Sequence, residues 1–210
     1  MIFVDQIGKQ IDVMLHPRKA INKGLILSKA LGYYATLGFL AFLLFLILGS
    51  IVIITNPSAV GLLLAHIGMG IGTAASFALL ALAGVILFFG LMPISMLINA
   101  WVYRLVGKNL FRAFKGRFSD TVTAYAYAVS LMAFVYGLAP LLLEGPAAIL
   151  LFVALFVIFI VWAYIILILG ISRIHRISAL AVLGILVAEM VILWLMSVVV
   201  FAFAALVAAL

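Results

Sequence analysis

This chain of 210 residues is 70% hydrophobic and only 8% charged, whereas a soluble domain is about half apolar and about one quarter charged. Its mean hydropathy of +1.52 excludes a water-soluble globular protein and predicts that lipid surrounds most of its side chains. The net charge of +7 comes from basic residues in short segments beside apolar spans. It therefore points to membrane topology and anionic lipid headgroups, and we expect no nucleic-acid partner.

Residues 1–32 are predicted to form a cytoplasmic N-terminal amphipathic segment. Within it, residues 2–15 are predicted to form a helix whose apolar side chains share one face, namely Phe3, Ile7, Ile11, Met14 and Leu15. A short helix of this kind is typical of one that lies in the plane of the membrane interface. Pro17 suits the first turn of a second short helix.

Five apolar spans follow, at about 33–54, 74–100, 121–143, 147–170 and 179–203. At about 1.5 Å per residue, each is long enough to cross a bilayer core of about 30 Å. They predict an all-α, polytopic membrane protein in which residues 33–210 form a single five-transmembrane-helix bundle with short interfacial helices.

The segments between the first four spans contain further signals. Residues 59–72 are too short to cross the bilayer, and we interpret them as an interfacial or re-entrant piece. Pro93 predicts a kink in the second span, because proline removes a backbone hydrogen bond. Glu144-Gly145-Pro146 predicts a very tight turn between the third and fourth spans.

Residues 101–118 are predicted to form a second interfacial helix or helix-like loop, since they combine basic and aromatic side chains. A short basic loop is predicted over 171–178. The candidate contacts for anionic lipid or an acidic partner are Arg104, Lys108, Arg112, Lys115, Arg117, Arg173 and Arg176. We favour lipid headgroups, which attract each nearby basic residue by about 1 kcal/mol.

The distribution of basic residues predicts the orientation of the chain. Five Lys and Arg residues lie within 1–32, five within 101–118 and two within 171–178, which accounts for all 12. The alternate connecting segments contain none. The positive-inside rule therefore predicts a multi-pass protein of the cell membrane, with the N-terminus in the cytoplasm and the C-terminus outside.

Glu189 is the one acidic residue within a predicted span, about 15 Å along the fifth helix. Charged side chains inside a membrane are costly and usually face the bundle interior, where they have partners. Two interpretations stay open: a neutral Glu189 that fixes helix packing, or a site for a proton, an ion or a lipid headgroup. The candidate members of a polar cluster around it are Thr36, Ser95, Asn99, Tyr127, Ser130 and Tyr164.

Candidate residues for catalysis and metal binding are scarce. The chain has no cysteine, which excludes disulfides and cysteine-based metal or nucleophile sites. His16, His66 and His175 each lack a second histidine or a carboxylate at metal-ligand spacing. Because no nucleophile–base pair and no paired carboxylates are evident either, we predict a non-enzymatic protein without a metal or cofactor.

Several features follow one another in a recognisable order. A proline-led stretch, LHPRKAI, precedes the first span, and a proline-containing second span leads to Gly107-Lys108, Phe118 and Ala124-Tyr125-Ala126-Tyr127. Pro140 lies near the far end of the third span, and WAYIILILGISRIHRISALAV covers the fourth span, a loop and an alanine-led fifth span. In this order the chain resembles the Yip domain family, the Ypt/Rab GTPase-interacting membrane proteins, in a short prokaryotic-type form. The resemblance implies a five-span fold, no catalysis, and a role in membrane organisation or trafficking.

Together, these features predict a scaffold or organiser of the membrane. Segments 2–15 and 101–118 would insert into the cytoplasmic leaflet while the spans anchor them. Membrane lipids are the expected partners, and a second copy of the chain or another protein is a further option. The alternative function is a small transporter, or an ion or proton channel, that uses Glu189. The small number of spans and the absence of an evident internal repeat speak against it.

Overall fold

The computed structural model describes residues 2–21, 24–58, 60–61, 73–114 and 116–208, with the backbone alone for 2–3, 18, 73–74 and 199–208. This part of the chain is all-α and contains five helices that are long and apolar enough to cross a membrane. The predicted fold class is therefore confirmed. The predicted interfacial or re-entrant piece at 59–72 lies, apart from residues 60–61, outside the described residues.

The long helices correspond to the predicted spans, and all of them extend beyond those spans except α7, which ends before residue 143. They are α3 (Leu27–Thr55), α5 (Thr73–Val85) with η1 (Ile86–Leu91) and α6 (Met92–Leu105), α7 (Phe118–Gly137), α8 (Pro146–His175) and α9 (Ala179–Ala208). Two short helices precede them, α1 (Ile2–Leu15) and α2 (Pro17–Ala20). Because α8 continues to His175, most of the loop predicted over 171–178 is helical.

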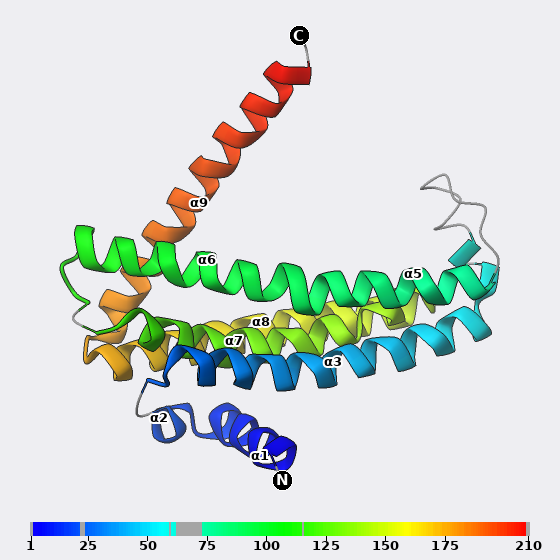
Figure 1. Cartoon of the computed structure of the whole chain (residues 1–210), viewed down its shortest axis with the longest axis horizontal. Helices are drawn as coiled ribbons and strands as arrows, with labels where there is room; N and C mark the ends of the chain where they lie inside the picture. The colour runs from blue at the N-terminus through cyan, green and yellow to red at the C-terminus, as the bar shows by residue number, and fades with distance from the viewer. Residues whose placement is uncertain (1, 22–23, 59, 62–72, 115, 209–210) are drawn as a thin grey trace.

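Four of the spans run side by side, and α7 is the central one (Figure 1). Every residue of α7 from 121 to 128 is buried. Small side chains at Ala124, Ala126 and Ala128 allow the neighbouring helices to approach α7 closely. The outward-facing side chains of the bundle are apolar, and Leu150 and Ile158 are 71% and 62% exposed. An apolar exterior of this kind requires lipid as its solvent.

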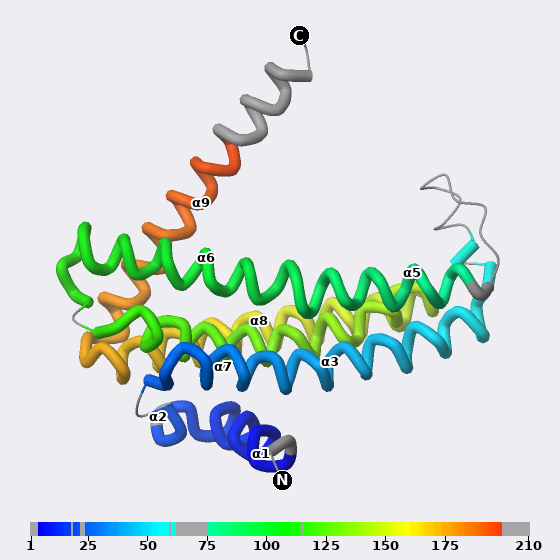
Figure 2. The backbone as a smooth tube through the Cα atoms, viewed as in Figure 1, coloured from blue at the N-terminus to red at the C-terminus, as the bar shows by residue number. Residues whose placement is uncertain are grey.

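The first half of the fifth span packs against the other spans. Helix α9 leaves the bundle obliquely (Figure 2). Val182, Ile185 and Glu189 are buried, whereas Trp194 and Leu195 are at least half exposed. The side chains of residues 194–198 are therefore available to lipid, while the first half of α9 packs against the bundle.

Pro93 is accommodated by a change of helix type. Immediately before it, η1 is a π-helix in which the Met92 N–H donates to the Leu87 carbonyl. In the same pattern the N–H of residue 93 would donate to the Phe88 carbonyl, but proline has no N–H. The buried Tyr34 hydroxyl donates to the Phe88 carbonyl instead, at 2.8 Å. A side chain from α3 thus satisfies the backbone group that proline leaves unpaired.

The prediction of a separate interfacial helix over 101–118 is wrong. Helix α6 continues directly into the π-helical η2 (Val106–Leu110), because nothing between Ala100 and Leu110 interrupts a helix. The chain then leaves the helix at Arg112, whose φ of 49° is left-handed. Arg112 therefore lies outside the continuous helix that carries Arg104 and Lys108, so these three basic residues do not share one helix. Lys115 lies outside the described residues.

The predicted turn between the third and fourth spans is present. Helix α7 is followed by the 3-10 helix η3 (Ala139–Leu143), which contains Pro140. Gly145 then has a φ of 127°, a conformation that favours glycine, and Pro146 is the first residue of α8. The Glu144 carboxylate accepts a hydrogen bond from the Thr55 hydroxyl at 2.9 Å, which joins this turn to the end of α3.

Candidate functional site

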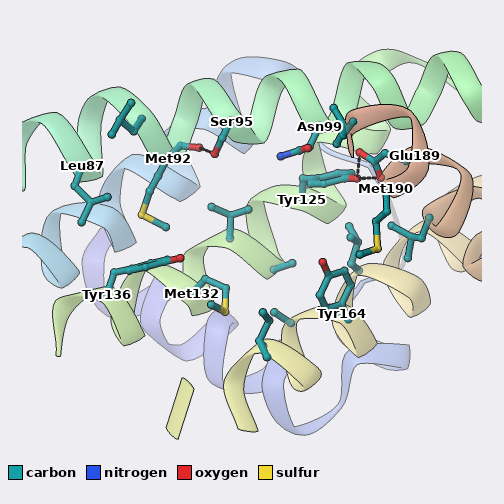
Figure 3. A pocket seen from close by; sticks show the side chains of 18 residues that line it. Leu87, Met92, Ser95, Asn99, Tyr125, Met132, Tyr136, Tyr164, Glu189 and Met190 are labelled. Atoms are coloured by element: carbon teal, nitrogen blue, oxygen red, sulfur yellow. Dashed lines mark hydrogen bonds between the residues drawn. The ribbon is translucent and has the colours of Figure 1, made fainter. Parts of the chain in front are cut away.

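A cavity of about 580 Å³ lies between α6, α7, α8 and the first half of α9. Its polar groups gather at one end, and its other end is apolar apart from Tyr136 (Figure 3). The polar end contains Asn99, Tyr125, Tyr164 and Glu189. A mostly apolar cavity of this size with a few convergent polar groups is typical of a ligand site.

Glu189 is held at this polar end by one hydrogen-bond donor. The Tyr125 hydroxyl lies 2.8 Å from Glu189 Oε2 and 3.0 Å from Oε1. Glu189 is only 3% exposed. Within the described part of the chain, no basic nitrogen lies within 4.0 Å of its carboxylate. The site therefore contains a buried acidic group without a counter-charge from these residues.

The structure brings three of the predicted cluster residues to the same cavity as Glu189. Asn99 and Ser95 come from α6, and Tyr164 comes from α8. The Ser95 hydroxyl donates to the Met92 carbonyl in its own helix at 2.9 Å. The side chains of Asn99 and Tyr164 form no hydrogen bond with a described residue. They remain available to a molecule in the cavity.

The other predicted members lie elsewhere. Tyr127 is on a different side of α7, where its ring packs edge-on against Tyr33 at a centroid distance of 4.8 Å and Lys9 Nζ lies 5.4 Å from its centroid. Ser130 is fully buried, and its hydroxyl has no hydrogen-bond partner among the described residues. The Thr36 hydroxyl donates to the Gly32 carbonyl within α3. None of the three lines the cavity.

Tyr125 is the residue that the sequence reasoning missed, although it is the direct partner of Glu189. Tyr125 and Tyr127 are two residues apart, so they point to different sides of α7. A helical pattern that joins Tyr125 with Val129 and Met132 would have placed it on the cavity side. The sequence does not show which side of α7 faces α9, because this depends on the arrangement of the helices. The helical pattern alone therefore does not identify Tyr125 as the partner of Glu189.

Helix α1 binds to the bundle through the buried Val13 and through hydrogen bonds of a polar side chain and its backbone. Gln10 accepts a hydrogen bond from the Tyr33 hydroxyl and donates one to the Tyr127 carbonyl at 3.3 Å. Trp162 donates from its indole N–H to the Met14 carbonyl at 3.0 Å. In contrast, Val4, Ile7, Ile11 and Leu15 are exposed. Of the predicted apolar face of α1, Ile7, Ile11 and Leu15 are thus directed away from the bundle, Met14 packs against it, and the side chain of Phe3 lies outside the described residues.

The described basic candidates gather at one end of the molecule, where α6 and α8 end and α7 begins. We call this the basic end. Lys108, Arg112, Arg117, Arg173 and Arg176 are exposed there, and Arg104 is half-buried. They come from the end of α6, the following loop and the end of α8. Glu144 lies at the opposite ends of α7 and α8, so the two ends of the bundle differ in charge.

No protein-family model matches the chain, and neither a curated protein nor a solved structure matches it. Within the described residues, no three His, Cys, Asp or Glu side chains gather closely enough to hold a metal ion. The arrangement offers two chemical features: an apolar surface with one basic end, and a cavity with one buried acid.

Proposed function

We propose that this protein is a non-enzymatic integral membrane protein of the Yip type that organises or shapes the membrane from its cytoplasmic leaflet. The observation that supports this proposal is the position of α1. Val4, Ile7, Ile11 and Leu15 face outward, while Gln10, the buried Val13 and the backbone of Met14 attach the helix to the bundle. An amphipathic helix presented in this way inserts between lipid headgroups and displaces them.

The depth of α1 agrees with an interfacial position. A helix needs about 20 residues to cross the hydrocarbon core. Counted from Pro146 at the start of α8, the crossing segment ends near Trp162–Ile166. Counted back from Thr55 at the end of α3, it begins near Thr36. Helix α1 contacts Trp162 on α8 and Tyr33 on α3. Tyrosine and tryptophan are enriched at membrane interfaces. These contacts therefore support a position for α1 at the boundary between headgroups and hydrocarbon.

The proposal places the basic end in the cytosol, as the positive-inside rule predicts. Since the chain lacks cysteine, single-cysteine variants test this orientation directly. We expect a membrane-impermeant maleimide added to intact cells to label the Glu144→Cys variant and to leave the Lys108→Cys variant unlabelled. Both variants should react after permeabilisation. The reverse pattern in intact cells would show that the basic end faces outward.

Replacing Ile7 and Ile11 by glutamine tests the role of α1. Both side chains are exposed on the apolar face, so the double variant should weaken membrane insertion by roughly 2–4 kcal/mol. We expect the purified wild-type protein to tubulate or fragment vesicles that contain anionic lipid, as seen by electron microscopy, and the I7Q/I11Q variant to lose most of this effect.

The matched control changes the same number of residues on the polar side of α1. Asp5 and Asp12 are also exposed, and their replacement by glutamine leaves the apolar face intact. The D5Q/D12Q variant should shape vesicles at least as well as the wild type. Equal vesicle remodelling by I7Q/I11Q and the wild type would exclude α1 as the element that shapes the membrane.

A second candidate function is transport of protons or ions through Glu189, which the buried acid in the cavity favours. A flux assay in proteoliposomes separates the two functions. Under the organiser proposal, the wild type carries no flux above protein-free vesicles. A flux that Glu189→Ala abolishes and Glu144→Ala preserves would replace that proposal with a transporter or channel, because Glu144 lies at the other end of α8.

A further inference from the structure

We propose that the cavity beside Glu189 binds a lipophilic amine, that is, an amphiphile with a single alkyl or acyl chain and an ammonium head. The head would lie against Glu189 and Asn99, and the chain would follow the apolar part of the cavity. This proposal concerns a different part of the molecule from α1. It can hold whether or not the protein shapes membranes or conducts ions.

The charge at the polar end selects the head group. An ionised carboxylate has about four acceptor positions, and the described residues supply Glu189 with one donor, the Tyr125 hydroxyl. No described basic side chain completes the site. An ammonium group would supply both the missing positive charge and up to three further N–H donors. A phosphate or sulfate head would instead bring a second negative charge to Glu189.

The groups around Glu189 suit an ammonium head as well. The Asn99 side chain forms no hydrogen bond with a described residue, so its carbonyl oxygen can accept an N–H. The rings of Tyr125 and Tyr164 line the same end of the cavity, and aromatic faces attract cations. Carboxylate, amide oxygen and aromatic faces together make a site that recognises an amine rather than an anion.

The remainder of the cavity suits an apolar chain. Along η1 and α6 the cavity extends from Leu87 to Asn99, a separation of at most about 18 Å at the rise of an α-helix. Met92 and Met132 line this part (Figure 3), and methionine side chains adapt to flexible apolar ligands. The cavity volume of about 580 Å³ lies within the range of small-molecule sites.

The direction of the cavity matches that of a membrane lipid. Counted from Pro146, the segment of α8 that crosses the bilayer ends near Tyr164. Tyr164 therefore lies near the membrane interface at the basic end. Leu87 and Tyr136 lie farther into the spans. A ligand with its head at Glu189 would therefore have the orientation of a lipid in the leaflet next to the basic end. It could enter sideways, because Ser95 and Tyr164 are exposed at the cavity margin.

Binding can be measured with the full chain in nanodiscs of phosphatidylcholine and phosphatidylglycerol, which contain no primary amine. The probes are radiolabelled dodecylammonium and dodecyl sulfate, which share one chain and differ in the sign of the head. We expect saturable binding of dodecylammonium above that of protein-free discs, and none of dodecyl sulfate. Glu189→Gln should weaken dodecylammonium binding at least tenfold, and Glu144→Gln should leave it unchanged.

A second variant keeps the test decisive if Glu189→Gln does not fold. Ala163 lines the cavity and is 5% exposed, so Ala163→Leu fills part of the space and leaves every charge in place. It should also reduce dodecylammonium binding. The proposal fails if dodecyl sulfate binds as well as dodecylammonium, or if a folded Glu189→Gln or Ala163→Leu protein binds dodecylammonium with wild-type affinity.

The source of the amine is a separate question, answered by mass spectrometry of lipids extracted from the purified protein. An amine-bearing amphiphile that co-purifies with the wild type and is depleted from Glu189→Gln identifies a membrane lipid. Binding of the added probe without such a lipid identifies an amine from outside the membrane. Neither assay depends on vesicle remodelling or flux, so failure here leaves the tests of the proposed function intact.

Discussion

Replacing Phe114 by alanine is expected to lower the free energy of unfolding by about 3–5 kcal/mol. Phe114 is 7% exposed in the loop between η2 and α7. Its ring stacks on His175 at a centroid distance of 4.3 Å and packs against Tyr103 at 5.3 Å. The loop lies at the basic end, outside the apolar spans, so its truncation loses both packing and the burial of apolar surface from water.

Gly107 makes the position of this ring possible. A Cβ atom at residue 107 would lie 2.7 Å from Phe114 Cε2, which is too close for two carbon atoms. A glycine is needed at position 107 because the following loop folds back and places the Phe114 ring against its backbone. Phe114 in turn fixes the loop that carries Arg112 and Arg117, so its loss should also loosen the basic end.

The measurement is equilibrium unfolding in mixed micelles, with Phe111→Ala as the control. Phe111 lies in the same loop and is 44% exposed, so its truncation should change the free energy of unfolding by no more than about 0.5 kcal/mol. A loss of equal size in both variants would contradict the packing of Phe114 described above.

The second large effect is expected for Leu37→Ala, at about 2–3 kcal/mol of lost stability. Leu37 is fully buried in α3, which packs against α7. A span remains in the bilayer when the bundle comes apart, so transfer from water contributes little there. The cost arises from the void that truncation leaves, because the surrounding helices relax only partially and the lining atoms lose their contacts.

Leu43→Ala is the matched control in the same helix. Leu43 is 37% exposed on the outside of α3, where lipid chains fill the space that a shorter side chain leaves. We expect a loss below about 0.5 kcal/mol in the same unfolding assay. Similar losses for Leu37→Ala and Leu43→Ala would mean that α3 does not face α7 through Leu37.

The sequence determined the class and the order of the elements. Five long apolar runs predict five spans because no soluble core can bury them, and the turn at Gly145-Pro146 follows from the backbone preferences of these two residues. Glu189 could be singled out because an acid within an apolar run is costly. These conclusions depend on the order and type of residues along the chain, so they need no knowledge of how the helices pack.

Which side of each helix meets which neighbour is set by the packing of the helices. It separates Tyr125, which holds Glu189, from Tyr127, which faces α1, and it separates the buried Phe114 from the exposed Phe111. The structure also shows that α9 packs through its first half, whereas the side chains of residues 194–198 are exposed. In a chain that is apolar on nearly every side, the hydrophobic pattern does not mark an inner face. Packing shape and a few hydrogen bonds therefore select the partners.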